Sequence, residues 1–227
     1  HDEVRLIIEG DSSYVLYADP PADDYDFSDW RQGEVVEGRY DPRLPRDLPA
    51  GGYALNLYLD NLKILSLGEL RVRPLTRTFT VPDIARPVDV VFGEGAGALL
   101  RLRGYDIDPL RSGQPLNVTL YWQSLRETPV DYRVFLHLRD AEAGELVSQV
   151  DQMPRGGDYP TSLWMTGEVV TDRHTLHIPP DLPPGSYDLT VGFYLPMSGD
   201  HLRVQAGTDA GDRRQSYRLD TIETSTD

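Results

Sequence analysis

The 227-residue chain contains no cysteine, a single lysine and no long apolar run. The absence of cysteine excludes disulfide bonds, thiolate catalysis and cysteine-ligated metal sites. No stretch approaches the roughly 18 consecutive apolar residues that a membrane-spanning helix needs. Segments with the apolar spacing of an amphipathic helix are also missing, which favours a fold built from strands.

Positive charge is scarce as well. The 37 acidic residues exceed the 22 lysines and arginines and give a formal net charge of −15. Such a chain repels the phosphates of nucleic acids and the surface of an anionic membrane. We therefore expect neither of them as a partner.

Residues 24–55 and 158–189 are two copies of one motif, related by a constant offset of 134 without a gap. Sixteen of the 32 positions are identical, among them Trp30/Trp164, Glu34/Glu168 and Arg39/Arg173. An internal repeat indicates that the protein is built from repeated structural units, whatever the roles of its individual residues. Features that are present in both copies more often serve the fold than one active site, so the repeat predicts two related domains.

Short runs of alternating apolar residues, separated by turn signals about every 8 to 12 residues, predict an all-β protein. In the first copy the strands are expected at residues 4–9, 14–19, 34–44, 52–59 and 64–72. In the second copy they are expected at 88–92, 98–107, 115–123, 132–139, 145–151, 168–178, 186–194, 201–205 and 216–223.

The two copies are unequal in length. We assign residues 1–74 to a half-length domain, 75–87 to a proline-bounded extended connector and 88–227 to a complete domain. Residues 88–131 precede the strand that matches Val4–Glu9, and the first copy has no counterpart to them. The first domain is either simply smaller or is completed from elsewhere. A longer polypeptide, a neighbouring subunit or the second domain could each supply the missing strands.

A shared Asp-Leu-Pro-x-Gly-x-Tyr run occupies residues 47–53 and 181–187. It resembles the turn before a late strand of immunoglobulin-like and fibronectin-like sandwiches, in which a tyrosine hydroxyl bonds back to the main chain. The residues that carry this signature are Pro49, Gly51 and Tyr53, with Pro183, Gly185 and Tyr187 in the second copy. The sequence therefore predicts two tandem immunoglobulin/fibronectin-like β-sandwiches, the first incomplete with about five strands.

Two aromatic pairs are the candidate ligand-binding residues. Trp30 follows Tyr25 in the first copy, and Trp164 follows Tyr159 in the second. Exposed flat rings at these positions would stack on a sugar. The alternative is that each tryptophan closes one end of its sandwich, with the indole N–H donating to a loop carbonyl.

A run of acidic residues in the first copy is the candidate metal site. Its members are Asp19, Asp23, Asp24, Asp26 and Asp29. Calcium takes six to eight oxygen ligands, and carboxylates in one loop would supply several of them. No calcium-loop consensus is present, and a solvated loop is the alternative reading. Calcium is the only cofactor that the sequence suggests, and no phosphate loop or nucleophile motif indicates an enzyme.

Three stretches of the second copy resemble a known β-sandwich module. They are GYDIDPLRSGQPLNVTLYWQSL at 104–125, DYRVFLHLRD at 131–140 and the motif at 158–194. The module recurs in bacterial, often Chloroflexi-type, cell-envelope proteins, frequently on the outer side of membrane glycosyltransferase-like proteins. The resemblance covers nearly all of 86–224 and the later half of the module in 4–72. It implies no catalytic residues, and no glycosyltransferase motif accompanies it here.

From the resemblance we expect a non-catalytic binding or scaffolding module at the cell surface or outside the cell. A chain that begins at His1 also suits a mature protein without its signal peptide, or a piece of a longer one. Expected partners are envelope proteins, other copies of the chain, or glycans. Two alternatives stay open. One is a filament or surface-layer subunit whose first domain receives a strand from its neighbour, and the other is a carbohydrate-binding module.

Overall fold

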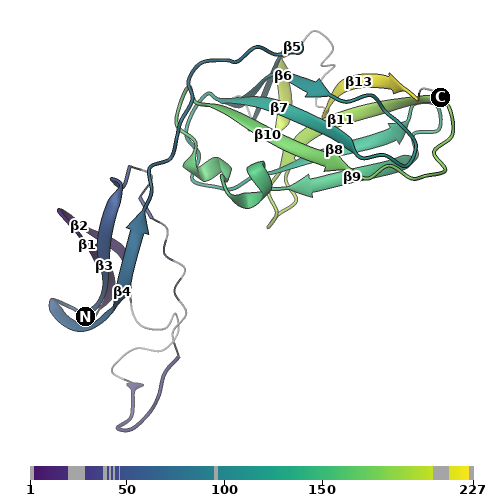
Figure 1. Cartoon of the computed structure of the whole chain (residues 1–227). Helices are drawn as coiled ribbons and strands as arrows, with labels where there is room; N and C mark the ends of the chain where they lie inside the picture. The colour runs from purple at the N-terminus through teal and green to yellow at the C-terminus, as the bar shows by residue number, and fades with distance from the viewer. Residues whose placement is uncertain are drawn as a thin grey trace. The chain divides into compact units, whose positions relative to one another are not determined.

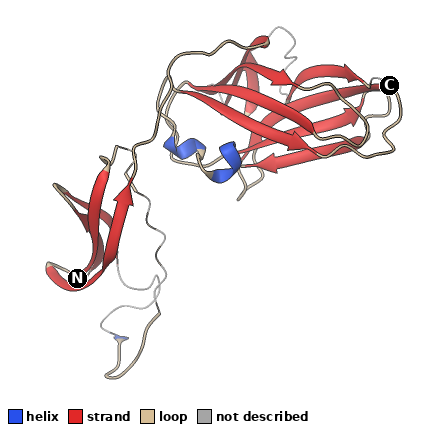
Figure 2. Cartoon of the chain, viewed as in Figure 1, coloured by secondary structure: helices blue, strands red, loops and turns tan. Residues whose placement is uncertain are grey.

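The computed structural model of the chain describes residues 3–19, 29–37, 40, 42, 44–45, 47–94, 97–206 and 215–224. Within them the regular elements are antiparallel strands and short 3-10 segments, including Pro154–Gly157 and Thr161–Leu163 (Figure 2). The prediction of an all-β protein is confirmed. In this described part, no helix is long and apolar enough to cross a membrane.

The contacts divide the chain into two units, His1–Thr76 and Arg77–Asp227. Most of the segment that the sequence suggested as a connector therefore belongs to the second unit. Thr78, for example, accepts a hydrogen bond from the main-chain N–H of Val169 at 2.6 Å.

The first unit holds one four-stranded sheet in the order β2-β1-β3-β4 (Figure 1). Its strands are β1 (Val4–Glu9), β2 (Ser13–Asp19), β3 (Gly51–Leu59) and β4 (Leu62–Val72). Alternation places Val4, Leu6 and Ile8 on one face of β1, and all three are buried. β2 and β4 are the two edges of this sheet.

The second unit is a two-layer sandwich. One sheet has the order β10-β7-β6-β5-β12 and the other has the order β13-β11-β8-β9. The first sheet contains β5 (Arg86–Glu94), β6 (Gly97–Ile107), β7 (Leu116–Ser124), β10 (Val169–Leu176) and β12 (Arg203–Ala206). The second contains β8 (Arg133–Asp140), β9 (Leu146–Gln152), β11 (Ser186–Tyr194) and β13 (Tyr217–Glu223). One continuous apolar core, with Trp122, Trp164 and Phe193 fully buried, lies between the sheets.

The two units share the order of one sheet. The order β2-β1-β3-β4 corresponds strand for strand to β9-β8-β11-β13, and in the repeat Tyr53 of β3 is equivalent to Tyr187 of β11. The described residues of the first unit contain no counterpart to the other sheet of the second unit. Within the described residues, the first unit therefore has a counterpart to only one of the two sheets of the second unit.

One predicted strand is wrong. The described residues in the range 34–44 have no strand structure, although Gly33-Glu34-Val35-Val36 repeats the letters that lead into β10. The physical reason is that the two segments differ in whether a neighbouring strand is present to pair with them. β10 pairs along its whole length with β7, and among the described residues the first unit has no strand that corresponds to β7. A strand propensity alone does not fix an extended segment without a neighbour.

Candidate functional site

The repeated Trp-x-x-Gly-Glu-Val-Val motif forms the same turn in both units. The main-chain N–H of Glu168 donates to the carbonyl of Met165, and that of Glu34 donates to the carbonyl of Arg31, both at 3.0 Å. The preceding glycines have positive φ, +83° at Gly167 and +85° at Gly33. Only glycine adopts this conformation at little cost, which explains its presence in both copies.

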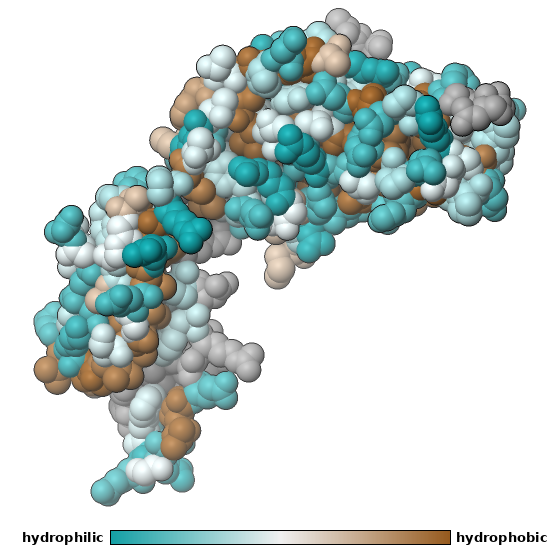
Figure 3. Space-filling view, in the orientation of Figure 1, coloured by the Kyte–Doolittle hydropathy of each residue, from teal (hydrophilic) through white to brown (hydrophobic). Residues whose placement is uncertain are grey.

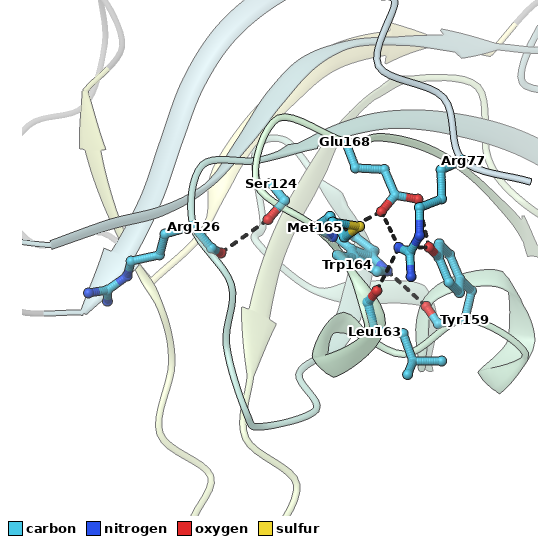
Figure 4. Close-up of polar contacts among 8 residues, drawn as sticks. All are labelled: Arg77, Ser124, Arg126, Tyr159, Leu163, Trp164, Met165 and Glu168. Carbon is cyan, nitrogen blue, oxygen red and sulfur yellow. Dashed lines mark hydrogen bonds and ion pairs between the residues drawn. The ribbon is translucent and has the colours of Figure 1, made fainter. Parts of the chain in front are cut away.

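In the second unit this turn carries a buried polar cluster centred on Glu168 (Figure 4). The Glu168 side chain is 1% exposed, and its carboxylate accepts from Arg77 Nη1 at 2.6 Å. It also accepts from the Tyr159 hydroxyl at 2.6 Å and from the main-chain N–H of Met165 at 2.9 Å. Three donors satisfy the charge that burial would otherwise penalise heavily.

Arg77, the first residue of the second unit, contributes the positive charge of the cluster. Its Nη1 also donates to the Leu163 carbonyl at 2.8 Å and to the Tyr159 hydroxyl at 2.6 Å. The guanidinium carbon lies 5.9 Å from the centre of the Tyr159 ring. Arg77 and Glu168 are 91 residues apart in the sequence. Their ion pair therefore binds the first residues of the second unit to the turn that precedes β10. The partners of the Glu168 carboxylate all lie within the second unit.

The second copy of the candidate sugar-binding pair is buried. Trp164 is fully inaccessible and Tyr159 nearly so. The Trp164 indole N–H donates to the main-chain carbonyl of Tyr159 at 3.0 Å. This is the closing role that the sequence suggested as an alternative, and the pair offers no face for a sugar. Trp164 is buried because it packs in the core between two sheets.

The first copy of the pair is placed differently. Trp30 is partly exposed, and Tyr25 lies outside the described residues. Sugar stacking at Trp30 therefore stays a prediction.

The candidate calcium loop falls largely outside the described residues, which omit Asp23, Asp24 and Asp26. Asp19 ends β2, and Asp29 is exposed. Within the part of the chain that the structure describes, no group of three His, Cys, Asp or Glu side chains is placed to hold a metal ion. Calcium binding stays a prediction.

Both signature tyrosines make the bond to the main chain that their motif predicts. The Tyr187 hydroxyl donates to the carbonyl of Pro183, and the Tyr53 hydroxyl donates to that of Pro49, each at 2.8 Å. Gly51 begins β3, and Gly185 immediately precedes β11. The motif thus fixes the entry of the chain into equivalent strands of the two units.

Replacing Tyr187 with phenylalanine is expected to cost the second unit about 1 kcal/mol, the typical net value of one hydrogen bond. The ring stays and only the bond to Pro183 is lost. Urea unfolding of the full chain measures this loss. An unchanged midpoint would show that the hydroxyl contributes nothing to stability.

Two buried tyrosines of the second unit should make stability fall in alkali. Burial, followed by the bond to Glu168, raises the pKa of Tyr159, and burial, followed by the bond to Glu94, raises the pKa of Tyr132. The unfolded chain ionises near the ordinary value of 10.0, whereas the folded chain keeps both phenols neutral. Their contribution to stability is therefore complete below that pH and is lost progressively as the pH rises toward the folded pKa.

Urea midpoints at pH 9 and pH 11 test this expectation, with Tyr159→Phe as the comparison. The variant should lose less stability over this interval than the parent chain. Equal slopes would show that Tyr159 does not contribute to the alkaline loss.

The structure adds a second buried cluster that the sequence analysis missed. His174 Nε2 lies 2.7 Å from Asp172 Oδ2, and both side chains are fully buried. His174 Nδ1 lies 3.0 Å from Gln152 Nε2, and Asp172 also accepts from the main-chain N–H of Arg155 at 2.7 Å. Asp172 and His174 are two residues apart on a predicted strand, so their side chains were expected on the same face. This spacing was the one signal in the sequence from which the cluster could have been predicted. No local signal points to Arg77.

Apolar side chains remain exposed on the first unit. Four of them lie on the edge strand β4, namely Leu62, Ile64, Leu65 and Leu67, and each is about half exposed or more. Figure 3 shows apolar residues reaching the surface in this unit. Exposed leucines in a row on an edge strand indicate an interaction surface.

No protein-family model matches the chain, and no curated protein matches it either.

Proposed function

We propose that the chain is a non-catalytic binding or scaffolding module made of two tandem immunoglobulin-like or fibronectin-like sandwiches, the first of them incomplete. The observation that carries the proposal is the sheet formed by the described residues of the first unit, whose edge strand β4 exposes Leu62, Ile64, Leu65 and Leu67. The two buried polar clusters of the second unit are bonded internally, which suits a supporting role for that unit. The resemblance to envelope proteins supports a location at the cell surface or outside the cell, with envelope proteins, other copies of the chain or glycans as partners.

The second candidate is a filament or surface-layer subunit. The same exposed β4 edge favours it, because an edge strand can accept a strand from a neighbouring copy. Head-to-tail pairing of this kind does not close and would generate fibres.

Light scattering of the purified chain, with electron microscopy of the same sample, separates the two candidates. A binding module is expected to be a monomer of 25.6 kDa. Filaments or a ladder of oligomers would contradict that function and support the subunit.

The location is tested on cells of the source organism. Antibodies raised against the purified chain are expected to label intact cells. Labelling that appears only after lysis would contradict a surface location.

A further inference from the structure

A polar cluster of four side chains, Glu9, Asn56, Tyr58 and Lys63, spans three neighbouring strands of the first unit, β1, β3 and β4. The Glu9 carboxylate accepts from Asn56 Nδ2 at 2.5 Å through Oε2 and from the Tyr58 hydroxyl at 2.6 Å through Oε1. Lys63 Nζ lies 3.8 Å from the same Oε2 atom. One carboxylate oxygen is therefore the neighbour of both a primary amine and a carboxamide.

The register of the sheet places these side chains on one face. Asn56 and Tyr58 are two residues apart on β3, and Lys63 of β4 pairs with Tyr58. Asn56 pairs with Ile7 of β1, which is two residues before Glu9. Residues at diagonal positions of neighbouring strands, such as Lys63 and Asn56, are about 7–8 Å apart, within reach of a long side chain. The amine of Lys63 can therefore approach the Asn56 carboxamide.

Asn56 differs from most polar side chains of the sheet because it is completely buried. Its exposed fraction is 0%, and its Oδ1 has no hydrogen-bond partner among the described residues. A buried carbonyl oxygen without a donor is costly and calls for an explanation. Burial also keeps water from the carbonyl carbon, so an amine that attacks this carbon does not compete with hydrolysis.

Lys63 is the only lysine of the chain, and every other residue among the 22 lysines and arginines is an arginine. An arginine side chain stays protonated in proteins, whereas a lysine that gives up its proton is an amine nucleophile. The one side chain of the protein that can carry out amine chemistry thus lies at the carboxylate that binds Asn56.

The second unit does not repeat this cluster. Asn56 corresponds to Thr190 at the offset of 134. Glu9 corresponds to Arg139, because the two residues hold equivalent positions in the pairing of β1 with β3 and of β8 with β11. Since features shared by both copies serve the common fold, a cluster confined to one copy indicates a role of its own.

We propose that Lys63 and Asn56 form an intramolecular isopeptide bond, with Glu9 as the proton carrier. The Lys63 ammonium gives one proton to the Glu9 carboxylate, and the lone pair of the resulting amine forms a bond from Nζ to Cγ of Asn56. The bond from Cγ to Nδ2 breaks, and its electron pair goes to Nδ2. Nδ2 takes the two protons that Nζ has given up and leaves as ammonium. Nothing is oxidised or reduced, so the step needs no co-reactant.

The bond would fix an edge strand in place. It closes a ring across the β3–β4 hairpin and ties β4 covalently to its neighbour. Glu9 and Lys63 are partly exposed, which gives the ammonium ion a route to solvent. The inference goes beyond the proposed function, and its test requires no binding partner.

Intact-mass spectrometry of the purified full chain tests the bond. The mass is expected to be about 17 Da below the mass calculated from the sequence, a loss of one ammonia. Trypsin does not cleave after an acylated lysine, so residues 47–71 should appear as one fragment that is also about 17 Da light. The full calculated mass, with separate fragments 47–63 and 64–71, would overturn the inference. A loss of ammonia with cleavage after Lys63 would also overturn it, because the loss would then come from another reaction.

Three variants of the full chain assign the roles. Lys63→Arg removes the amine and Glu9→Gln removes the proton carrier at nearly constant size, so both are expected to show their full calculated masses. Glu69→Gln changes an exposed carboxylate on β4 and should keep the loss of ammonia. Persistence of the loss in Lys63→Arg would overturn the bond, and its persistence in Glu9→Gln would overturn the role of Glu9.

Discussion

Replacing Glu168 with alanine is expected to destabilise the second unit by about 3–5 kcal/mol, the usual cost of removing one partner from a buried ion pair. Arg77 would keep its charge within the protein but lose the carboxylate 2.6 Å away. The Tyr159 hydroxyl and the Met165 N–H would lose their acceptor as well. Urea unfolding at neutral pH, followed by tryptophan fluorescence, measures the loss. Trp30→Phe in the background restricts the signal to Trp122 and Trp164 of the second unit.

The repeat supplies the matched control. Glu34 makes the same turn but is exposed, and Glu34→Ala is expected to change stability by no more than about 0.5 kcal/mol. The double variant Arg77→Ala/Glu168→Ala should lose less than the sum of the single variants, because the two side chains interact directly. Additive losses would show that the ion pair carries no coupling energy, and equal losses at Glu34 and Glu168 would contradict the different burial of the two copies.

Much of the fold could be predicted because its signals are local. Alternation in β11 and the short turns between strands indicate a β-protein directly. The Tyr187 corner spans only four residues, from the hydroxyl to the Pro183 carbonyl, so its motif predicts its bond. The same local origin explains why the Tyr53 corner could be predicted equally well.

What could not be predicted depends on distant partners. The sequence Gly-Glu-Val-Val is followed by strand structure at 167–170 but not at 33–36. The difference arises because only the second copy lies beside β7. Trp164 is buried for the same reason, since two layers enclose it. Arg77 and Glu168 are 91 residues apart, so no local sequence pattern predicts that they form an ion pair.

A second large loss is expected from Phe193→Ala. Phe193 is fully buried and its ring lies 4.5 Å from that of Trp122 and 5.7 Å from that of Phe92, measured between centroids. Truncating a buried phenylalanine removes its apolar burial and leaves a cavity, which together cost about 3–5 kcal/mol. The loss of the edge-to-face contact with Phe92 and the tilted contact with Trp122 adds to this cost. Urea unfolding in the Trp30→Phe background measures it.

Leu59→Ala is the matched change in the first unit, because Leu59 pairs with Val4 as Phe193 pairs with Val134. Leu59 is only partly buried, so we expect a loss of about 1 kcal/mol from reduced apolar burial. A loss as large as that of Phe193→Ala would contradict the smaller burial of Leu59. The contrast between Phe193 and Leu59 therefore measures how much more strongly the second unit buries one of two equivalent positions.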